Sequence, residues 1–572
     1  VAEFLKEKQI EVVFGIIGSA NSHIFDSISK LGYTKIINTH HEQAAVMAMG
    51  AYYRASGKVS ATIVTAGAGA SNSITGIVSN WADSIPGIII SGNEGSQYIK
   101  DQEHLRMYGT QGFNIAKMVK DVTKWSHCLL DEHDIQHQLE LSYQISNMDR
   151  KGPVLLDIPF DIQSKVTTPR PWVPFKPTPN LHPKNGTKYI IEQINKAKKP
   201  LILGGNGVRL SDSKDKFNKF INHTKLPTTL TWSGIDLLES NNDNFYGRFG
   251  LYGQRASNFI VQNCDLLIVL GSRLALPQTG YDFNQFVRED KWFRSDCRDV
   301  LNELVDNMSS INPVNSEWKE YCSNIRTEYP WIGEEHNHKD NYTNSYQFMD
   351  KLSNHLKDDH IVVTDMGTAL LSGHQSIKLK PNQTMFTSLG LGEMGYGIAG
   401  AVGASAACPT KEVLCLNCDG GIMMNLQELH TVIENGLNVK IIIFNNDGYL
   451  MIKHTQKMLF KGNYVSVNKG TGIGLPNFKK LLPAFGYSYF SLKNNKNTDS
   501  AIDAFINYNG PAVLEVFMDP EQGFLPKVKG VAKEDNTILA PPIEEMSPLV
   551  SKEQLKNSML VELSNKSDQI KR

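Results

Sequence analysis

The chain has 572 residues, enough for three or four domains of ordinary size, each with a buried core. Its 58 Lys and Arg nearly balance 59 Asp and Glu, so the charge does not favour a nucleic acid or a membrane surface as a partner. The longest apolar runs, such as 266–270, are far shorter than a membrane span. Seven scattered cysteines and no visible secretory signal predict reduced thiols and a cytoplasmic protein.

The first block, residues 1–168, contains a predicted strand followed by a helix with an acidic first residue. Lys35–Asn38 is the strand, and Glu42 opens a helical pattern with alanines at close-packing spacings. Glu42 could be an ordinary first-turn acid that stabilises the helix dipole. Alternatively, it offers a carboxylate at the end of an apolar strand, where a ligand can meet it.

A middle block is expected at 186–332, after a proline-rich polar linker at 167–183. Two apolar runs, 200–203 and 265–270, each lead into a glycine turn. Such turns are the ordinary way to leave a strand in an α/β sheet, and nucleotides also bind at strand ends of this kind. The sequence leaves both interpretations open.

The third block, about 345–530, contains two apolar runs that end in polar turns. The run at 412–417 is followed by Asp419 and two glycines, Gly420 and Gly421. A helical pattern from Asn425 to Asn435 follows, and a β-branched run at 439–444 ends at Asn446. The pattern predicts two buried strands joined by a helix.

Asp419 and Asn446 are 27 positions apart, and adjacent parallel strands would bring them together at one edge of the sheet. Mg²⁺ prefers oxygen ligands and often combines a carboxylate with phosphates. The Asn446 amide oxygen and the Gly448 carbonyl would add two more oxygens, and Gly420 and Gly421 would let the backbone approach a phosphate closely. Each turn alone is more often only a turn, but their spacing and placement favour a metal-bound diphosphate.

Three blocks of this kind predict an α/β fold with three doubly wound parallel-sheet domains. The remaining tail, residues 531–572, contains a proline pair and then amphipathic charge, which suits either a lid or an arm.

Several segments are similar to the motifs of one enzyme family, and the similarity extends to about residue 530. They are Val13–Ser19, Thr65–Asn72, Gly152–Pro159, Asp365–Ala369 and Leu391–Gly397. Together with the residues around Glu42 and Asp419, they resemble the thiamine diphosphate (ThDP) dependent acetolactate synthase and 2-oxo acid decarboxylase superfamily. One departure is Cys418, where the family usually has the first glycine of Gly-Asp-Gly.

The resemblance implies a role for each motif. Glu42 would bond to the pyrimidine ring and promote loss of the thiazolium C2 proton, and the Gly392 carbonyl would accept from the ring's amino group. Met394 would hold the two rings in a V, although a plain core methionine is the alternative. The residues that would bind the diphosphate and its Mg²⁺ are Gly367, Thr368, Ala369, Asp419, Gly420, Gly421, Asn446 and Gly448, with Asp419, Asn446 and Gly448 on the metal.

The same resemblance assigns 1–168 to pyrimidine binding, 186–332 to a Rossmann-like central domain and 345–530 to diphosphate binding. In relatives the central domain binds FAD, ADP or nothing. Positions that resemble FAD contacts here are Gly204, Gly205, Thr229, Leu230 and Arg273. Because the glutamate domain of one subunit faces the diphosphate domain of another in this family, a homodimer or homotetramer is expected.

Other departures bear on the substrate. Phe160 stands where acetolactate synthases have a lysine, and the stretch 450–456 lacks their tryptophan. Ile452 stands where pyruvate decarboxylases have a glutamate that could protonate the intermediate. Ser19, Asn21 and Gln111 would face the substrate, or they are turn and cap residues.

The expected activity is decarboxylation of a small 2-oxo acid, followed by ligation to an acceptor carbonyl of another oxo acid or of a keto sugar. A decarboxylase that does not ligate is one alternative. A catalytically silent subunit of the same fold is another, although Glu42 argues against it.

Overall fold

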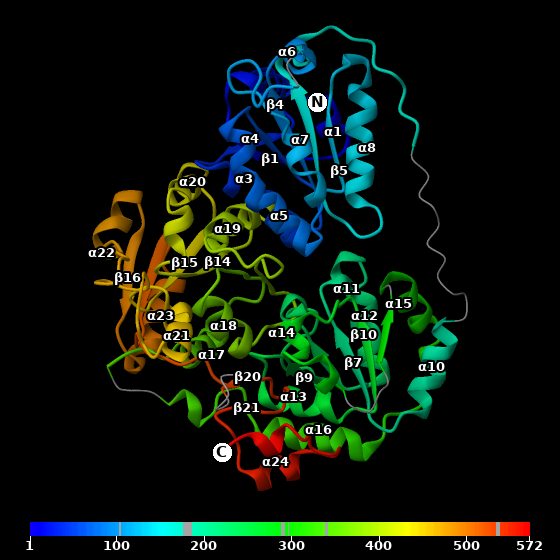
Figure 1. Ribbon diagram of the computed structural model, residues 1–572, viewed down its shortest axis with the longest axis vertical. Helices are drawn as coiled ribbons and strands as arrows, with labels where there is room; N and C mark the ends of the chain where they lie inside the picture. The colour runs from blue at the N-terminus through cyan, green and yellow to red at the C-terminus, as the bar shows by residue number, and fades with distance from the viewer. Residues whose placement is uncertain (102–103, 175–185, 288–291, 296, 338–340, 533–537) are drawn as a thin grey trace.

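The structure, a computed structural model, describes the chain except residues 102–103, 175–185, 288–291, 296, 338–340 and 533–537. Three α/β units follow one another along it: the first at the top of Figure 1, the middle one at the right and the third at the left. Each is built on a sheet in which all described strand pairs are parallel. The predicted fold class of three parallel-sheet α/β domains is confirmed.

The first domain has a six-stranded sheet in the order β2-β1-β3-β4-β6-β5. Its strands are β1 (Val12–Gly15), β2 (Lys35–Asn38), β3 (Ala61–Val64), β4 (Gly87–Asn93), β5 (Trp125–Cys128) and β6 (Pro153–Pro159). Its helices are α1 (Ala2–Glu7), α2 (Ser22–Leu31), α3 (Glu42–Ser56), α4 (Ala68–Asn72), α5 (Ile74–Asp83), α6 (Ser96–Asp101), α7 (Ile115–Met118), α8 (Ile135–Asn147) and α9 (Phe160–Ser164).

The middle domain has a five-stranded sheet in the order β11-β10-β7-β8-β9. Its strands are β7 (Pro200–Gly204), β8 (Thr228–Leu230), β9 (Phe245–Arg248), β10 (Leu266–Leu270) and β11 (Trp292–Ser295). Its helices are α10 (Gly186–Lys196), α11 (Gly207–Leu210), α12 (Lys214–Thr224), α13 (Arg255–Asn263), α14 (Leu276–Thr279), α15 (Cys297–Asp306) and α16 (Ser316–Glu328).

The third domain repeats the first domain's arrangement, in the order β13-β12-β14-β15-β17-β16. Its strands are β12 (Ile361–Thr364), β13 (Thr384–Phe386), β14 (Val413–Cys418), β15 (Val439–Asn445), β16 (Ser488–Leu492) and β17 (Ala512–Phe517). Its helices are α17 (Ser345–His355), α18 (Thr368–Ser376), α19 (Tyr396–Ala407), α20 (Glu428–Glu434), α21 (Leu450–Leu459), α22 (Phe478–Leu481) and α23 (Thr498–Ile506).

The central strands are largely apolar because helices cover both faces of each sheet. Every residue of β4 and of β14 is buried. The prediction that α20 begins at Asn425 is wrong: a 3₁₀ turn spans Ile422–Asn425, and the helix starts at Glu428. Asn425 instead donates its side-chain amide to the Gly395 carbonyl at 2.9 Å, which holds this turn against a neighbouring loop.

The first and third domains pack through α3 and α19, two helices rich in small residues. A Cβ at Gly403 would collide with the backbone carbonyl of Ala48, so the two backbones touch at this point. The alanines predicted to pack closely, from Ala44 to Ala51, are fully buried at this contact. Close approach of small residues therefore joins the domain that carries Glu42 to the domain that carries Asp419.

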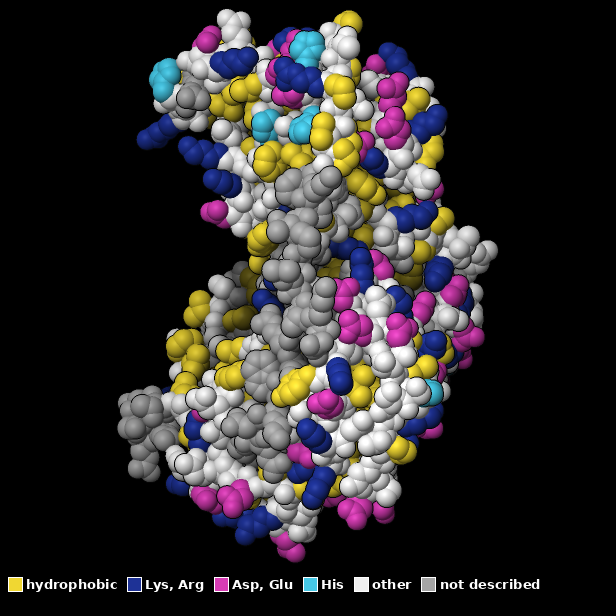
Figure 2. All heavy atoms as spheres, turned by 90° about the vertical axis from the view of Figure 1, so that its right-hand side faces the viewer, with side chains coloured by type: hydrophobic (Ala, Val, Ile, Leu, Met, Phe, Trp, Pro, Cys, Tyr) yellow, Lys and Arg dark blue, Asp and Glu magenta, His cyan; other side chains and the backbone are white. Residues whose placement is uncertain are grey.

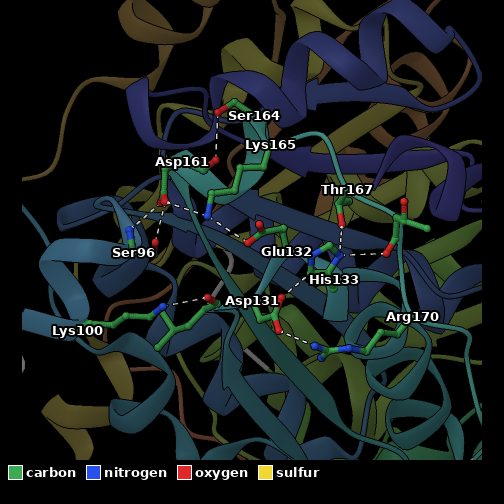
Figure 3. A network of polar contacts seen from close by, with 12 residues as sticks. Ser96, Lys100, Asp131, Glu132, His133, Asp161, Ser164, Lys165, Thr167 and Arg170 are labelled. Carbon is green, nitrogen blue, oxygen red and sulfur yellow. Dashed lines mark hydrogen bonds and ion pairs between the residues drawn. The ribbon is translucent and has the colours of Figure 1, made fainter.

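The segment that leaves the first domain is held to it by ion pairs and hydrogen bonds (Figure 3). Asp161 on α9 accepts from the Ser96 backbone N–H and hydroxyl, both at 2.7 Å. Farther along, Arg170 pairs with Asp131 at 2.9 Å and with Asp134. The linker predicted at 167–183 thus begins fixed to the domain surface, and its part from 175 lies outside the described residues.

The C-terminal tail packs as an arm along the middle domain, below α13 and α16 in Figure 1. Its elements are β19 (Val531–Ala532), β20 (Ile538–Leu539), β21 (Met546–Ser547) and α24 (Lys552–Ser558), and β21 pairs with β18 (Lys527–Val528), which precedes the tail. Arg255 on α13 donates to the carbonyls of Met546 and Pro548 at 3.1 and 2.7 Å. Met546 and Leu555 are completely buried in the middle domain's core.

Positive and negative side chains are interspersed on the face shown in Figure 2, as the near-zero net charge predicts. None of the helices within the described residues is long and apolar enough to cross a membrane.

Candidate cofactor site

Asp419 lies at the carboxyl end of β14, fully buried, with its carboxylate held by backbone N–H groups. Oδ2 accepts from Asn446 and Gly448, both at 3.0 Å, and Oδ1 from Gly420 at 2.8 Å. Strands β14 and β15 are paired in parallel, which is why two turns 27 residues apart meet at one edge. Burial raises the pKa of the Asp419 carboxyl group to about 7, although hydrogen bonds from backbone N–H groups lower this pKa.

The Asn446 side chain has one polar atom without a partner among the described residues. Its amide nitrogen donates to the Thr368 hydroxyl at 3.2 Å, while Oδ1 is buried and accepts nothing. A buried acceptor left unpaired is costly, so it fits a position where a ligand supplies the missing partner. A hard cation beside the Asp419 carboxylate would do this, and it would also offset the cost of burying that carboxylate.

The loop before α18 completes the cradle. Gly367 has φ +96° and Gly448 has φ +130°, backbone conformations that glycine adopts without strain. Cys418 fills the place of the usual glycine by packing under this loop: its thiol donates to the Met366 carbonyl at 3.3 Å, and the Ala369 N–H points to its sulfur at 3.5 Å. Cys415 and Cys418 are free, buried thiols.

Asp365 connects this cradle to the loop of Gly392 and Met394, a role that the sequence analysis did not assign. Its Oδ1 accepts from the Gly395 N–H at 2.9 Å, and its Oδ2 is buried without a partner among the described residues. A Cβ at Gly392 would meet the Met366 side chain at 3.3 Å. The predicted diphosphate residues and the predicted pyrimidine loop therefore lie at one edge of the third sheet. Asp365's position at the end of an apolar strand was the available signal.

Glu42 and Gln111 lie together at the corresponding edge of the first domain. Glu42, on the first turn of α3 and 8% exposed, accepts from the Asn72 side chain at 3.0 Å. A Cβ at Gly69 would lie 3.3 Å from its carboxylate, and one at Gly67 would lie 3.0 Å from the Gln111 side chain. Gly67 and the short helix α4 thus lie against the two predicted site residues, where the sequence resembled a glycine loop.

Ser19 and Asn21 form the 3₁₀ turn after β1. Asn21 is fully buried: its side-chain oxygen accepts from the Gly18 N–H at 2.7 Å, and its amide donates to the Ile16 carbonyl at 3.0 Å. These bonds are the ones expected if Asn21 is a turn and cap residue. A role of Asn21 in substrate binding stays a prediction.

Within one chain, Glu42 and the loop of Gly392 and Met394 both have contacts in or near α5. Glu42 bonds to Asn72 just before this helix, whereas the loop meets Ser79 and Asp83.

A cavity of about 820 Å³ lies where the three domains meet. Gly207 and Arg273 of the middle domain line it, together with first-domain residues 82–84 and 147–151 and with Leu389 and Gly390 of the third domain. Four cations are on its wall: Arg150, Lys151, Arg273 and Arg298. Three acidic residues, Asp83, Asp149 and Asp299, also line it. Its volume and its cations would accommodate a ligand with a diphosphate.

The other predicted FAD positions lie at the ends of the middle strands. A Cβ at Gly205 would collide with the Gly271 carbonyl, so this glycine is needed for the two strand ends to approach. Thr229 and Leu230 are completely buried in β8, and the Thr229 hydroxyl has no partner among the described residues.

Three family models match the chain in order. They are the N-terminal binding domain of thiamine pyrophosphate (ThDP) enzymes over residues 1–118, the central domain over 187–300 and the C-terminal binding domain over 365–516. Each match covers most of one of the three sheets described above.

The acetolactate synthase isozyme 2 large subunit of Escherichia coli K12 is 30% identical over 545 residues, which is 92% of this chain and 96% of the relative. The chain belongs to the acetolactate synthase-like, ThDP-dependent enzymes. The acetolactate synthase large subunits of Pyropia yezoensis (29% over 554 residues, 91% of each chain) and Lactococcus lactis (26% over 563 residues, 94% of this chain and 95% of the relative) are also similar to it.

The donor set at the third sheet fits the cofactor of this family. The buried Asp419 carboxylate, the unpaired Asn446 oxygen and the glycine cradle of Gly367 and Gly448 are the groups that a metal-bound diphosphate requires. The relatives support ThDP as the cofactor, since all three family models are those of thiamine pyrophosphate enzymes.

Proposed function

We propose that the protein decarboxylates a small 2-oxo acid and ligates the product to an acceptor carbonyl, using ThDP and Mg²⁺. The observation that carries the proposal is the buried pair at the third sheet's edge, Asp419 with its three backbone N–H donors and Asn446 with its unpaired oxygen. The cofactor, when bound, supplies the electron sink for loss of CO₂. The similarity to acetolactate synthases supports ligation as the outcome.

The chain's own groups have separate tasks in this proposal. Asp419, Asn446 and the Gly448 carbonyl hold the cation, and the N–H groups of the Gly367–Ala369 turn face the diphosphate. The Gly392 carbonyl would accept from the ring's amino group, and the Met394 side chain would support the ring. Glu42 holds a proton at the ring nitrogen, a task for which its buried position excludes competing water.

The residues around the entrance support ligation over simple decarboxylation. Ile452 on α21 is 50% exposed and cannot donate a proton, so the side chain that would release an aldehyde is missing there. Phe160 is 41% exposed and stacks on His23 with ring centroids 4.7 Å apart. Phe160 stands where housekeeping acetolactate synthases are expected to have a lysine. The acceptor in this proposal is therefore either another oxo acid or a keto sugar.

The remaining expectations are part of the same proposal. The cavity at the middle domain takes a nucleotide, with FAD first and ADP second. Two or more copies of the chain assemble, with Glu42 of one copy facing the Gly392 loop of another. The protein acts in the cytoplasm, where its seven free thiols would stay reduced.

The test is a product assay on the purified protein with ThDP and Mg²⁺. A panel of 2-oxo acids is incubated alone and with an excess of keto acids or keto-sugar nucleotides, and CO₂ and products are measured by mass spectrometry. Ligated products support the proposal. Free aldehyde and CO₂ with every acceptor would show a plain decarboxylase, and no CO₂ from any oxo acid would show a silent subunit.

A further inference from the structure

The loop that leads into Gly392 and Met394 is fastened to the first domain at its start. The Ser388 and Ser79 hydroxyl groups are 2.9 Å apart, and the Leu389 N–H donates to the Asp83 carboxylate at 3.1 Å. A Cβ at Gly390 would lie 2.8 Å from the Ala82 backbone. All three first-domain residues belong to α5, so this helix fixes the first half of the loop.

The second half of the loop is fastened by Glu393, an acidic residue between Gly392 and Met394. The Ser388 hydroxyl donates to Glu393 Oε2 at 2.7 Å. Because Ser388 donates its single proton to Glu393, its oxygen can accept from the Ser79 hydroxyl group, and Ser79 also interacts with Glu393. A chain of two hydrogen bonds therefore runs from Ser79 on α5 through Ser388 to Glu393, and it closes the loop on itself.

The surroundings make a carboxyl group costly at this place. Burial raises the pKa of Glu393, and Oε1 is buried without a partner among the described residues. Arg54 is near, but it is paired with Asp83 at 2.5 Å, and both side chains are about nine-tenths buried. A buried acceptor without a partner is destabilising, so Glu393 does not stabilise the fold through Oε1. Its favourable interaction is the bond that Oε2 accepts from Ser388.

The backbone on both sides of Glu393 needs a restraint. Gly392 has φ +78° and Gly395 has φ +86°, and glycine moves between conformations more freely than any other residue. The Gly392 carbonyl and the Met394 side chain can support a ring only if this backbone keeps one conformation. The Glu393 side chain is the one whose bond ties this stretch back to Ser388.

We propose that Glu393 is a positioning residue for ThDP: through Ser388 and Ser79 it holds the Gly392–Met394 loop in the conformation that receives the pyrimidine ring. This inference rests on the proposed function, because the loop has a ring to receive only if the chain binds ThDP. The interaction crosses between domains, so it also makes the cofactor loop depend on how the first and third domains are docked.

The experiment measures ThDP binding by calorimetry, with Mg²⁺ present, for the wild type, Glu393→Ala, Glu393→Gln and Ser79→Ala. Glu393→Ala should weaken binding about tenfold, a factor that corresponds to about 1.4 kcal/mol. Glu393→Gln should stay within about twofold of the wild type, because its amide oxygen accepts the same bond from Ser388. The double variant Ser79→Ala/Glu393→Ala should be no weaker than Glu393→Ala alone, since both changes break one chain of bonds.

A matched control is Glu545→Ala, which removes a buried carboxylate paired with Arg572 in the C-terminal arm. It should leave ThDP affinity unchanged. The proposal is overturned if Glu393→Ala binds ThDP as tightly as the wild type. It is also overturned if Glu393→Ala and Glu545→Ala lower the thermal midpoint equally and change ThDP affinity equally. Failure of the wild type itself to bind ThDP would overturn the proposed function and this inference together. Normal wild-type binding with an unaffected Glu393→Ala would overturn this inference alone.

Discussion

Two buried carboxylates stand side by side at the edge of the third sheet, and their partners separate their roles. Asp419 receives its N–H donors from the two turns that would surround a cation, Asp419–Gly420 and Asn446–Gly448. Asp365 accepts from Gly395 and so orients the loop of the pyrimidine. Burial raises the pKa of both groups to about 7. Charge at this edge is therefore costly until a cation arrives, which makes metal binding and cofactor binding interdependent.

Removing the Asp419 carboxylate should abolish this interdependence. Asp419→Ala is expected to weaken Mg²⁺-dependent ThDP binding by at least about 100-fold, because a charged ligand and its buried hydrogen bonds are lost together. Calorimetry with ThDP and Mg²⁺ measures it. Asp447→Asn, which removes the charge of an exposed neighbour in the same turn, is the matched control and should bind ThDP normally. Equal binding by both variants would contradict the metal assignment.

Glu42 should act on a proton rather than on affinity. Glu42→Gln is expected to bind ThDP within a few-fold of the wild type but to slow exchange of the thiazolium C2 proton by at least about 100-fold, the usual size of such an effect. NMR of the bound cofactor after quenching in deuterated buffer gives the exchange rate. Glu434→Gln, on the exposed side of α20, should exchange like the wild type. Wild-type exchange in Glu42→Gln would remove Glu42 from catalysis.

Asp365 should make the cofactor-free protein less stable as the pH rises. The pKa of this carboxyl group is about 7 in the folded protein and 3.8 for the free side chain, so between these values the folded state holds a proton that the unfolded state has lost. Stability therefore falls as the pH rises from about 4 to about 7, by an amount on the order of 3 kcal/mol.

The measurement compares thermal midpoints between about pH 5 and pH 7.5 for the wild type and Asp365→Asn, which keeps an acceptor for Gly395 but has no proton to lose. The variant should show the smaller fall in midpoint. Asp26→Asn, at an exposed pair with Lys30, should follow the wild type. Parallel curves for all three proteins would show that Asp365 does not titrate in this range.

At the scale of elements, the sequence predicts which residues meet at the ends of strands. It does not predict contacts between loops that are far apart in the chain. Asp419 and Asn446 are predictable because uninterrupted apolar strands have known neighbours, and polar residues after them share an edge. The late start of α20 at Glu428 is not predictable, because it depends on the Asn425 amide bond to Gly395 in another loop. Glu393 is missed for the same reason: its bond to Ser388 leads on to Ser79, which lies 314 positions away in a different domain.

The middle domain shows the limit most clearly. Gly205 and Gly207 are glycines because β7 and β10 approach at their ends, which is the ordinary interpretation of these turns. The cavity beside them is built by residues of all three domains, so no pattern within the middle block could have revealed it. Arg273 lines that cavity, whereas Thr229 and Leu230 lie inside the sheet.

If the cavity binds FAD, the protein purified from cells should be yellow and should release flavin on denaturation. Arg273 is one of the cations that line the cavity. Arg273→Ala should lower the flavin content by at least about tenfold if the arginine binds the diphosphate. Absorbance near 450 nm and chromatography of the released cofactor measure this. Lys199→Ala, outside the residues that line the cavity, is the control. A colourless, fully active protein that takes up no added flavin or ADP would exclude the nucleotide.

At the scale of the whole molecule, the proposed site draws on residues of the first and third domains. Glu42 and Gln111 lie at the first domain's edge, while Ser388 and Leu389, at the start of the loop of Gly392 and Met394, are held to Ser79 and Asp83 of α5. Large apolar side chains around the third domain's edge are exposed, among them Leu391, Met424 and Ile452. Their exposure agrees with the predicted second copy of the chain, whose Glu42 would meet this edge and whose surface would cover these side chains.

Mixing two inactive variants tests whether the site forms between chains. Glu42→Gln lacks the group for the proton, and Asp419→Ala lacks the cation site, so each alone should be nearly inactive. In a dimer with one chain of each kind, one of the two sites pairs the intact Glu42 of one chain with the intact Asp419 of the other. Random mixing makes half of the dimers mixed, each with one good site, so activity should recover to about a quarter of the wild type.

The subunits must exchange for this recovery, so the variants are co-expressed with different tags and the mixed dimer is isolated, where activity should reach about half of the wild type. Light scattering gives the number of chains in the same sample. A site formed within one chain predicts the opposite result, because neither chain of a mixed dimer contains both groups. Mixed dimers as inactive as the parent variants would therefore contradict a site shared between chains, even if the protein proved to be oligomeric.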